Sequence, residues 1–183
     1  MAMQLVAFLR AINVGGHTVK MENLRILFES FGLKRIQTFI ASGNVLFSTS
    51  DPDLPALTAR IETGLEAALG YCVSAFLRTP VELTSIVHHQ AFDPSAMQVA
   101  EAYNIGFLED EPAETAREKL LALQTDIDRL HLHGRELYWL CRVRQSQSSL
   151  SNAAFEKALG MHSTLRGIST IQKIDTLLSS QPG

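Results

Sequence analysis

One short segment near the amino terminus carries the residues best suited to hold an anion. Arg10 and Asn13 close an apolar run, and Gly15, Gly16 and His17 follow before a helical pattern begins. A strand that ends at paired glycines and leads into a helix presents main-chain N–H groups to one point. An arginine fork adds paired donors that match phosphate or carboxylate oxygens. The chemistry that this pattern predicts is capture of an anionic group.

A second segment, Ser42, Gly43 and Asn44, forms a turn between two β-rich runs. If the first and third strands of the sheet are antiparallel neighbours, the end of the first lies beside the start of the third. We therefore predict that Asn13 and Asn44 approach one another with Arg10 between them. The alternative stays open that these loops need no ligand, because glycine and asparagine are ordinary turn residues.

Thr164 and Arg166, just before the last helical pattern, add a hydroxyl and a second guanidinium to the candidate ligand-binding residues. No catalytic residue is assigned. Two other hypotheses stay open beside the binding module. One is an enzyme in which His17 is the acid or base while Arg10 or Arg166 stabilises negative charge. The other is a protein-interaction module that uses an exposed sheet edge or helix face.

Composition limits the partners that the chain is expected to have. The 183 residues are 46% hydrophobic and 19% charged, which is typical of a soluble globular protein. With 16 Lys+Arg against 19 Asp+Glu, the net charge of -3 gives no overall field to attract nucleic acid or an anionic membrane. The apolar run 5–9 is too short to span a membrane. We therefore expect a cytoplasmic protein whose partner is an anionic small molecule.

No metal or cofactor is expected from the motifs. Cys72 and Cys141 are far apart and lack ligand spacing, which favours buried thiols in a reducing compartment. His131 and His133 alternate on one strand face, and the pair 88–89 lies at a helix end, without further ligands at metal spacing. Neither a Walker loop nor a dinucleotide fingerprint occurs.

Hydrophobic periodicity predicts an α+β fold of two ferredoxin-like (split βαβ) halves, 1–80 and 81–183, each an antiparallel sheet with helices packed on one face. In the first half, strand, helix, strand, strand, helix and strand are expected over residues 5–12, 21–31, 36–40, 44–48, 54–69 and 71–78. The second half repeats this order over 103–159 without an obvious closing strand, and extra helices follow it. Residues 91–97 are expected to form a loop.

Three long motifs, from Phe8 to Gly16, Met21-x-x-Leu24, and Thr38 to Phe47, closely resemble the bacterial domain of unknown function 1697 family. The resemblance extends to the serine-rich stretch 146–151 and to the segment 164–166, so it covers nearly the whole chain. The family pattern usually has Arg-Asn where this chain has Arg166-Gly167. The resemblance implies a small cytoplasmic protein of two related α+β halves, with no established biochemical activity.

Overall fold

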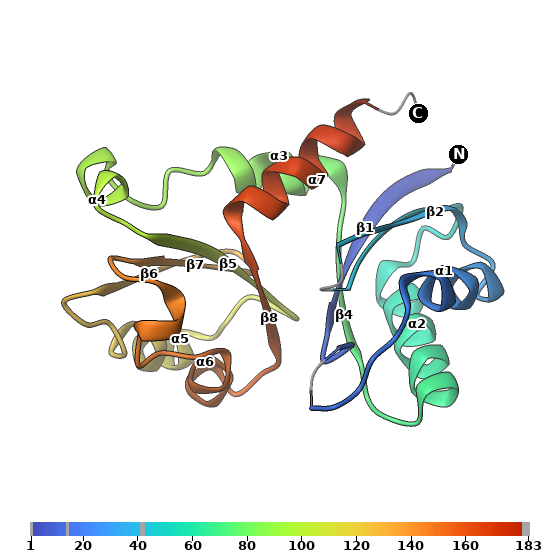
Figure 1. The fold of residues 1–183 in the computed structure, drawn as a ribbon, viewed down its shortest axis with the longest axis horizontal. Coiled ribbons are helices and arrows are strands. Elements are labelled where there is room, and N and C mark those ends of the chain that lie inside the picture. The colour runs from blue at the N-terminus through green and yellow to red at the C-terminus, as the bar shows by residue number, and fades with distance from the viewer. Residues whose placement is uncertain (1, 14, 41–42, 181–183) are drawn as a thin grey trace. The chain divides into compact units, whose positions relative to one another are not determined.

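The computed structural model describes residues 2–13, 15–40 and 43–180, which form an α+β fold with two four-stranded antiparallel sheets (Figure 1). The chain packs as two compact units: Met1–Thr84 with Ile174–Gly183, and Ser85–Lys173. The predicted halves, 1–80 and 81–183, differ from these units because the C-terminal helix is divided between the two. Within the first unit, the Thr84 hydroxyl donates to Asp175 Oδ1 at 2.6 Å.

The first unit follows the predicted order of strands and helices. Its elements are β1 (Met3–Arg10), α1 (Met21–Ser30), β2 (Lys34–Phe39), β3 (Asn44–Thr49), α2 (Leu54–Leu69) and β4 (Ser74–Arg78). The strand order is β2-β3-β1-β4, and β1 pairs antiparallel with β3, so that Phe8 lies opposite Asn44. The predicted antiparallel neighbourhood of the first and third strands is therefore confirmed.

Strand alternation builds the core of this unit. The helices α1 and α2 cover one face of this sheet (Figure 1). Leu5 and Leu9 of β1 pack in the core of this unit with Phe28 of α1 and Ile61 of α2. The sequence also marks the ends of α2. Asp53 Oδ1 accepts the Ala56 N–H at 3.0 Å, and Gly70 at φ 79° ends the helix in a left-handed conformation.

Short helices and the second sheet follow. The elements are α3 (Pro80–His88), α4 (Pro94–Gln98), β5 (Ala102–Leu108), α5 (Glu114–Leu121), β6 (Asp128–His133), β7 (Glu136–Cys141), the 3-10 turn η1 (Gln145–Gln147), α6 (Asn152–Leu159), β8 (Ser163–Gly167) and α7 (Ile168–Ser180). The strand order β6-β7-β5-β8 repeats the arrangement of the first sheet. Leu120 of α5 and Phe155 of α6 pack with Trp139 on one face of this sheet.

Two expectations for the second unit were wrong. A closing strand exists, because β8 pairs antiparallel with β5 and places Arg166 opposite Ile105. This five-residue strand has one large apolar side chain, Leu165, so the sequence shows no alternation there. The expected loop 91–97 also contains α4, whose first turn is capped by Asp93.

Of the helices in the part of the chain that the structure describes, none combines the length and the apolar content needed to cross a membrane.

Candidate functional site

A hydrogen bond to the Asn13 side chain closes the loop that follows β1. The strand ends because Ala11 adopts φ 65°, a left-handed conformation that no strand continues. Ile12 then turns into the core with 2% of its surface exposed. Asn13 Oδ1 accepts the Val19 N–H at 2.6 Å, which closes the loop just before α1. The Asn13 carboxamide therefore shapes the loop from within.

The second candidate segment lies directly beside this loop. The Leu9 N–H donates to the Gly43 carbonyl at 2.8 Å. Asn44 is fully buried, and its Nδ2 donates to the Phe39 carbonyl at 2.9 Å, across the turn between β2 and β3. Both candidate asparagines thus make main-chain hydrogen bonds inside their own loops. Ser42 lies outside the described residues.

An aromatic contact holds the exposed part of the loop. The His17 ring stacks on Tyr71 with centroids 3.8 Å apart, and the Tyr71 hydroxyl donates to the Ile12 carbonyl at 3.0 Å. Burial raises the pKa of Tyr71, so the hydroxyl keeps its proton for this bond. Gly15 and Gly16 are exposed between these anchors, at φ 64° and 87°. The loop is therefore braced at both ends of its glycine pair.

Arg10 ends β1, half-buried, opposite Ser74 of β4. The neighbouring residue Leu9 is hydrogen-bonded to Gly43, so Arg10 and the β2–β3 turn lie at the same end of the sheet. The structure thus brings Arg10 and the turn at Gly43 to the same strand ends. The two carboxamides, by contrast, serve their own loops.

Thr164 and Arg166 belong to the second unit, on β8, and both are buried. Arg166 Nη1 donates to Thr164 Oγ1 and to the Leu165 carbonyl, each at 2.8 Å. Burial lowers the pKa of Arg166 to about 10, because a charged guanidinium loses hydration there. These two predicted residues form one hydrogen-bonded group.

Sequence reasoning missed the counterpart of Arg166 in the first unit. Arg78 is 1% exposed, and its Nη1 donates to the Leu77 carbonyl at 2.8 Å. It lies opposite Val6 of β1, as Arg166 lies opposite Ile105 of β5. The signal was present as two Leu-Arg pairs, each within two residues of a following helix.

Sequence reasoning also did not predict that three histidines come together in the second unit. His89 Nε2 lies 3.0 Å from His131 Nε2, and its ring stacks on His133 with centroids 4.2 Å apart. His131 and His133 share a strand face, as predicted, but only the fold brings the residue after α3 onto them. Among the residues that the structure describes, no group of three or more His, Cys, Asp or Glu side chains is arranged to hold a metal ion.

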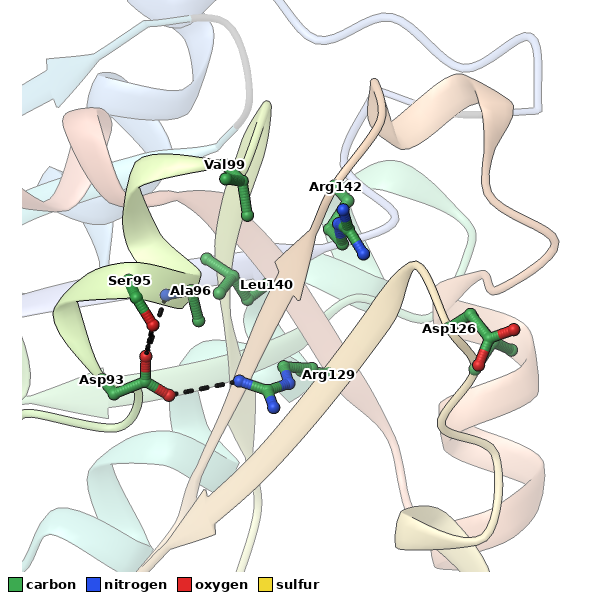
Figure 2. Close-up of a pocket in the computed structure, with 9 residues that line it drawn as sticks. Asp93, Ser95, Ala96, Val99, Asp126, Arg129, Leu140 and Arg142 are labelled. Carbon is green, nitrogen blue, oxygen red and sulfur yellow. Dashed lines mark hydrogen bonds and ion pairs between the residues drawn. The ribbon is translucent and has the colours of Figure 1, made fainter.

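A polar pocket of about 490 Å³ opens in the second unit, near the start of α4 (Figure 2). Asp93 accepts from Ser95 and from the Ala96 N–H and pairs with Arg129 at 3.3 Å, as the dashed lines in Figure 2 show. Ser95, the Ala96 amide and Arg129 hold the pKa of Asp93 at about 2. Two aspartates and two arginines line this pocket, so its formal charges balance and it does not single out an anion.

Comparison with known proteins identifies the family to which the chain belongs. The chain matches the model of the family described as "Protein of unknown function (DUF1697)" over residues 3–138. It therefore belongs to this family, and the resemblance stated from the sequence motifs is confirmed. No curated protein matches the chain.

Among solved structures, the chain is similar to the conserved bacterial protein SP0830 from Streptococcus pneumoniae. The two share 20% sequence identity and a TM-score of 0.79, over 98% of this chain and 100% of that chain. At this identity the likeness shows the fold alone.

Proposed function

We propose that Arg10, at the end of β1, and the loop after it, residues 11–13 and 15–20, capture a small anionic molecule such as a phosphorylated metabolite or a nucleotide. The observation that carries the proposal is the charge of two neighbouring segments. Residues 1–21 and 36–50 contain no aspartate or glutamate, and the first of these segments contributes Arg10 and Lys20. In a chain with a net charge of -3, this local excess of positive charge favours an anion.

Backbone conformation supports the same site. Ala11 at φ 65° and Ile40 at φ 52° are left-handed without being glycine, and Ile40 is β-branched. Such residues cost about 1–3 kcal/mol each and persist where the surrounding structure holds them, often at ligand sites. With Gly15 and Gly16 exposed, the loop offers main chain to a ligand at no steric cost.

The proposal gives each predicted residue a distinct task. Arg10 provides the guanidinium, and the main chain at Gly15 and Gly16 provides N–H donors. Asn13 and Asn44 keep the two segments in shape through their main-chain hydrogen bonds. The anion is therefore recognised by charge and backbone rather than by carboxamides.

Thermal unfolding in the presence of pyrophosphate, AMP and a sugar phosphate tests the proposal. A ligand that binds the folded chain at 100 times its Kd adds about 2.7 kcal/mol of stability and raises Tm. Arg10→Ala should remove this gain. Arg60→Ala is the matched control, since Arg60 is an exposed arginine of the same unit, 3.2 Å from Asp51, and should keep the gain.

Two outcomes would count against the anion site. Either none of the three anions raises the Tm of the wild type, or Arg10→Ala responds to them as fully as the wild type does. The open enzyme hypothesis is separated by His17→Ala. If any of these phosphate compounds is turned over, equal rates for wild type and His17→Ala would remove His17 from acid or base catalysis.

We also infer that each half is ferredoxin-like and that the protein works in a reducing compartment such as the cytoplasm. The strand order β2-β3-β1-β4, repeated as β6-β7-β5-β8, supports the first inference. Two free cysteines support the second, although only Cys141 is buried and the expectation of a buried thiol was wrong for Cys72, which is exposed.

A further inference from the structure

The second unit contains another pocket of about 490 Å³, whose lining is different in kind. It is built by the end of α3, the loop to α4, α4 itself, and the first residues of β5 and α7. Phe92 and Tyr103 meet edge to face in its wall with centroids 5.9 Å apart, and Met97 adds a flexible thioether. None of the described residues that line it is Lys, Arg, Asp or Glu. Its volume lies in the range of small-molecule sites, and its chemistry suits a neutral aromatic body.

His89 supplies one polar group of this wall, beside Gln90, Gln98 and Gln172. Its Nε2 lies 3.0 Å from His131 Nε2, so one of these two nitrogens carries the proton and the other accepts it. The second ring nitrogen of His89, Nδ1, has no hydrogen-bond partner among the residues that the structure describes. If His89 Nε2 carries the proton and donates to His131, Nδ1 is unprotonated and can accept a hydrogen bond. If His131 donates instead, Nδ1 of His89 carries the proton and can donate one. Because His89 lines the pocket, its Nδ1 is a hydrogen-bonding atom that a ligand can complete.

The surroundings keep this histidine pair neutral. Burial lowers the pKa of His89, and nearby His133 lowers it further, while Glu136 acts in the opposite direction. Burial also lowers the pKa of His131, assisted by His89, His133 and Arg117. Both rings are therefore neutral at neutral pH, which disfavours an anionic ligand at this point.

We infer that this pocket binds a small, neutral, planar aromatic molecule that carries one hydroxyl group, with His89 Nδ1 as its hydrogen-bond partner. A hydroxyl both donates and accepts, so it pairs with either tautomer of His89. Phe92 and Tyr103 receive the aromatic body edge to face or stacked. The site belongs to the second unit and does not rest on the anion site proposed for the loop of the first unit.

The test compares phenol with benzene by NMR titration of the whole chain. His89→Phe keeps a ring that can stack on His133 and Tyr138 but removes Nδ1. We expect this variant to bind phenol about tenfold more weakly, the effect of one lost hydrogen bond. Its affinity for benzene should stay within about twofold. His162→Gln, which changes an exposed histidine of the same unit, should leave both affinities unchanged.

Other outcomes overturn the inference. They are failure of the wild type to bind phenol, equal loss of phenol and benzene affinity in His89→Phe, or no loss of either. Tighter binding of benzoate than of phenol would mean that the pocket takes an anion. A measurement on the wild type avoids the variant altogether: phenol must shift the ¹⁵N resonance of His89 Nδ1, and an unshifted resonance contradicts the assignment.

Discussion

Gly43 is the residue at which the two candidate segments constrain each other most closely. Its φ is 79°, and its carbonyl accepts the Leu9 N–H. A Cβ at this position would lie 2.5 Å from Ile12 Cγ2, a distance that real Cβ atoms essentially never show. Both the conformation and the space therefore require glycine here.

Comparing Gly43→Ala with Gly16→Ala separates these two requirements. Gly16 has a similar φ of 87°, but a Cβ there would meet nothing within 4 Å. We expect Gly16→Ala to lower the free energy of unfolding by about 1–2 kcal/mol, the cost of a left-handed residue with a side chain. Gly43→Ala should cost about 1–3 kcal/mol more, because it also overpacks the core. Urea denaturation measures both, and equal losses would show that Ile12 does not confine the turn.

For single residues, the sequence predicted their positions in the sheet better than their hydrogen-bond partners. Arg10 and Gly43 could be placed at one sheet end, because strand order alone brings those ends together. The partners of Asn13 and Asn44 could not be predicted, since each amide bonds a main-chain group whose position depends on the folded loop. Sequence spacing also gave no hint of the bond from His89 to His131.

At the scale of elements, one buried carboxylate joins the β6–β7 hairpin to the segment after η1. Asp128 is fully buried and accepts from Trp139 Nε1 at 2.8 Å, from Ser148 Oγ at 2.9 Å and from Thr125 Oγ1 at 3.0 Å. All three donors are uncharged, and together they satisfy oxygens of a carboxyl group that has no access to solvent. The network fixes the hairpin against the chain that leads to α6.

Asp128→Ala should lower the free energy of unfolding by about 1–3 kcal/mol, because it leaves the buried Trp139 N–H without its acceptor. Trp139 is the one tryptophan of the chain, so its fluorescence follows unfolding at this network directly. Asp126→Ala removes a neighbouring exposed carboxylate and should change stability by less than about 0.5 kcal/mol. Equal effects of the two substitutions would show that the network adds no stability.

Elements were predictable where the sequence carries their end signals. Asp53 and Gly70 mark both ends of α2, and its apolar face is periodic, so the helix was predicted with its observed bounds. β8 has no comparable signal. Thr164 and Arg166 are polar, and only pairing with β5 makes this segment a strand. A strand that depends on pairing with a neighbouring strand cannot be recognised from the hydrophobic pattern of its own residues.

The whole molecule repeats one arrangement. Each unit has a four-stranded sheet of the same strand order, with two helices on one face. The last strand of each sheet contains a buried arginine, Arg78 at the end of β4 or Arg166 one residue before the end of β8, which bonds the preceding carbonyl at 2.8 Å. The sequence predicted two related halves, and the matching register of these arginines strengthens that relation.

Acid should destabilise the folded chain through two half-buried histidines, His89 and His131. In the folded state the pKa values of His89 and His131 lie below the ordinary 6.5, so below pH 6.5 the unfolded chain binds more protons. The free energy of unfolding should therefore fall as pH decreases from 7 toward 5. Urea denaturation across this range measures the slope, which should be shallower in His89→Phe. A slope of the opposite sign, or one that His89→Phe leaves unchanged, would contradict the attribution of the pH dependence to the lowered pKa values of these histidines.

The most direct test of the proposed anion site is a pyrophosphate titration of the whole chain, followed by the ¹H–¹⁵N resonances of its glycine amides. We predict saturable shifts at Gly15 and Gly16 that disappear in Arg10→Ala. Gly134 and Gly160, which belong to turns of the second unit, should not move. Saturable shifts confined to the second unit, or no saturable shift at Gly15 and Gly16, would contradict the account.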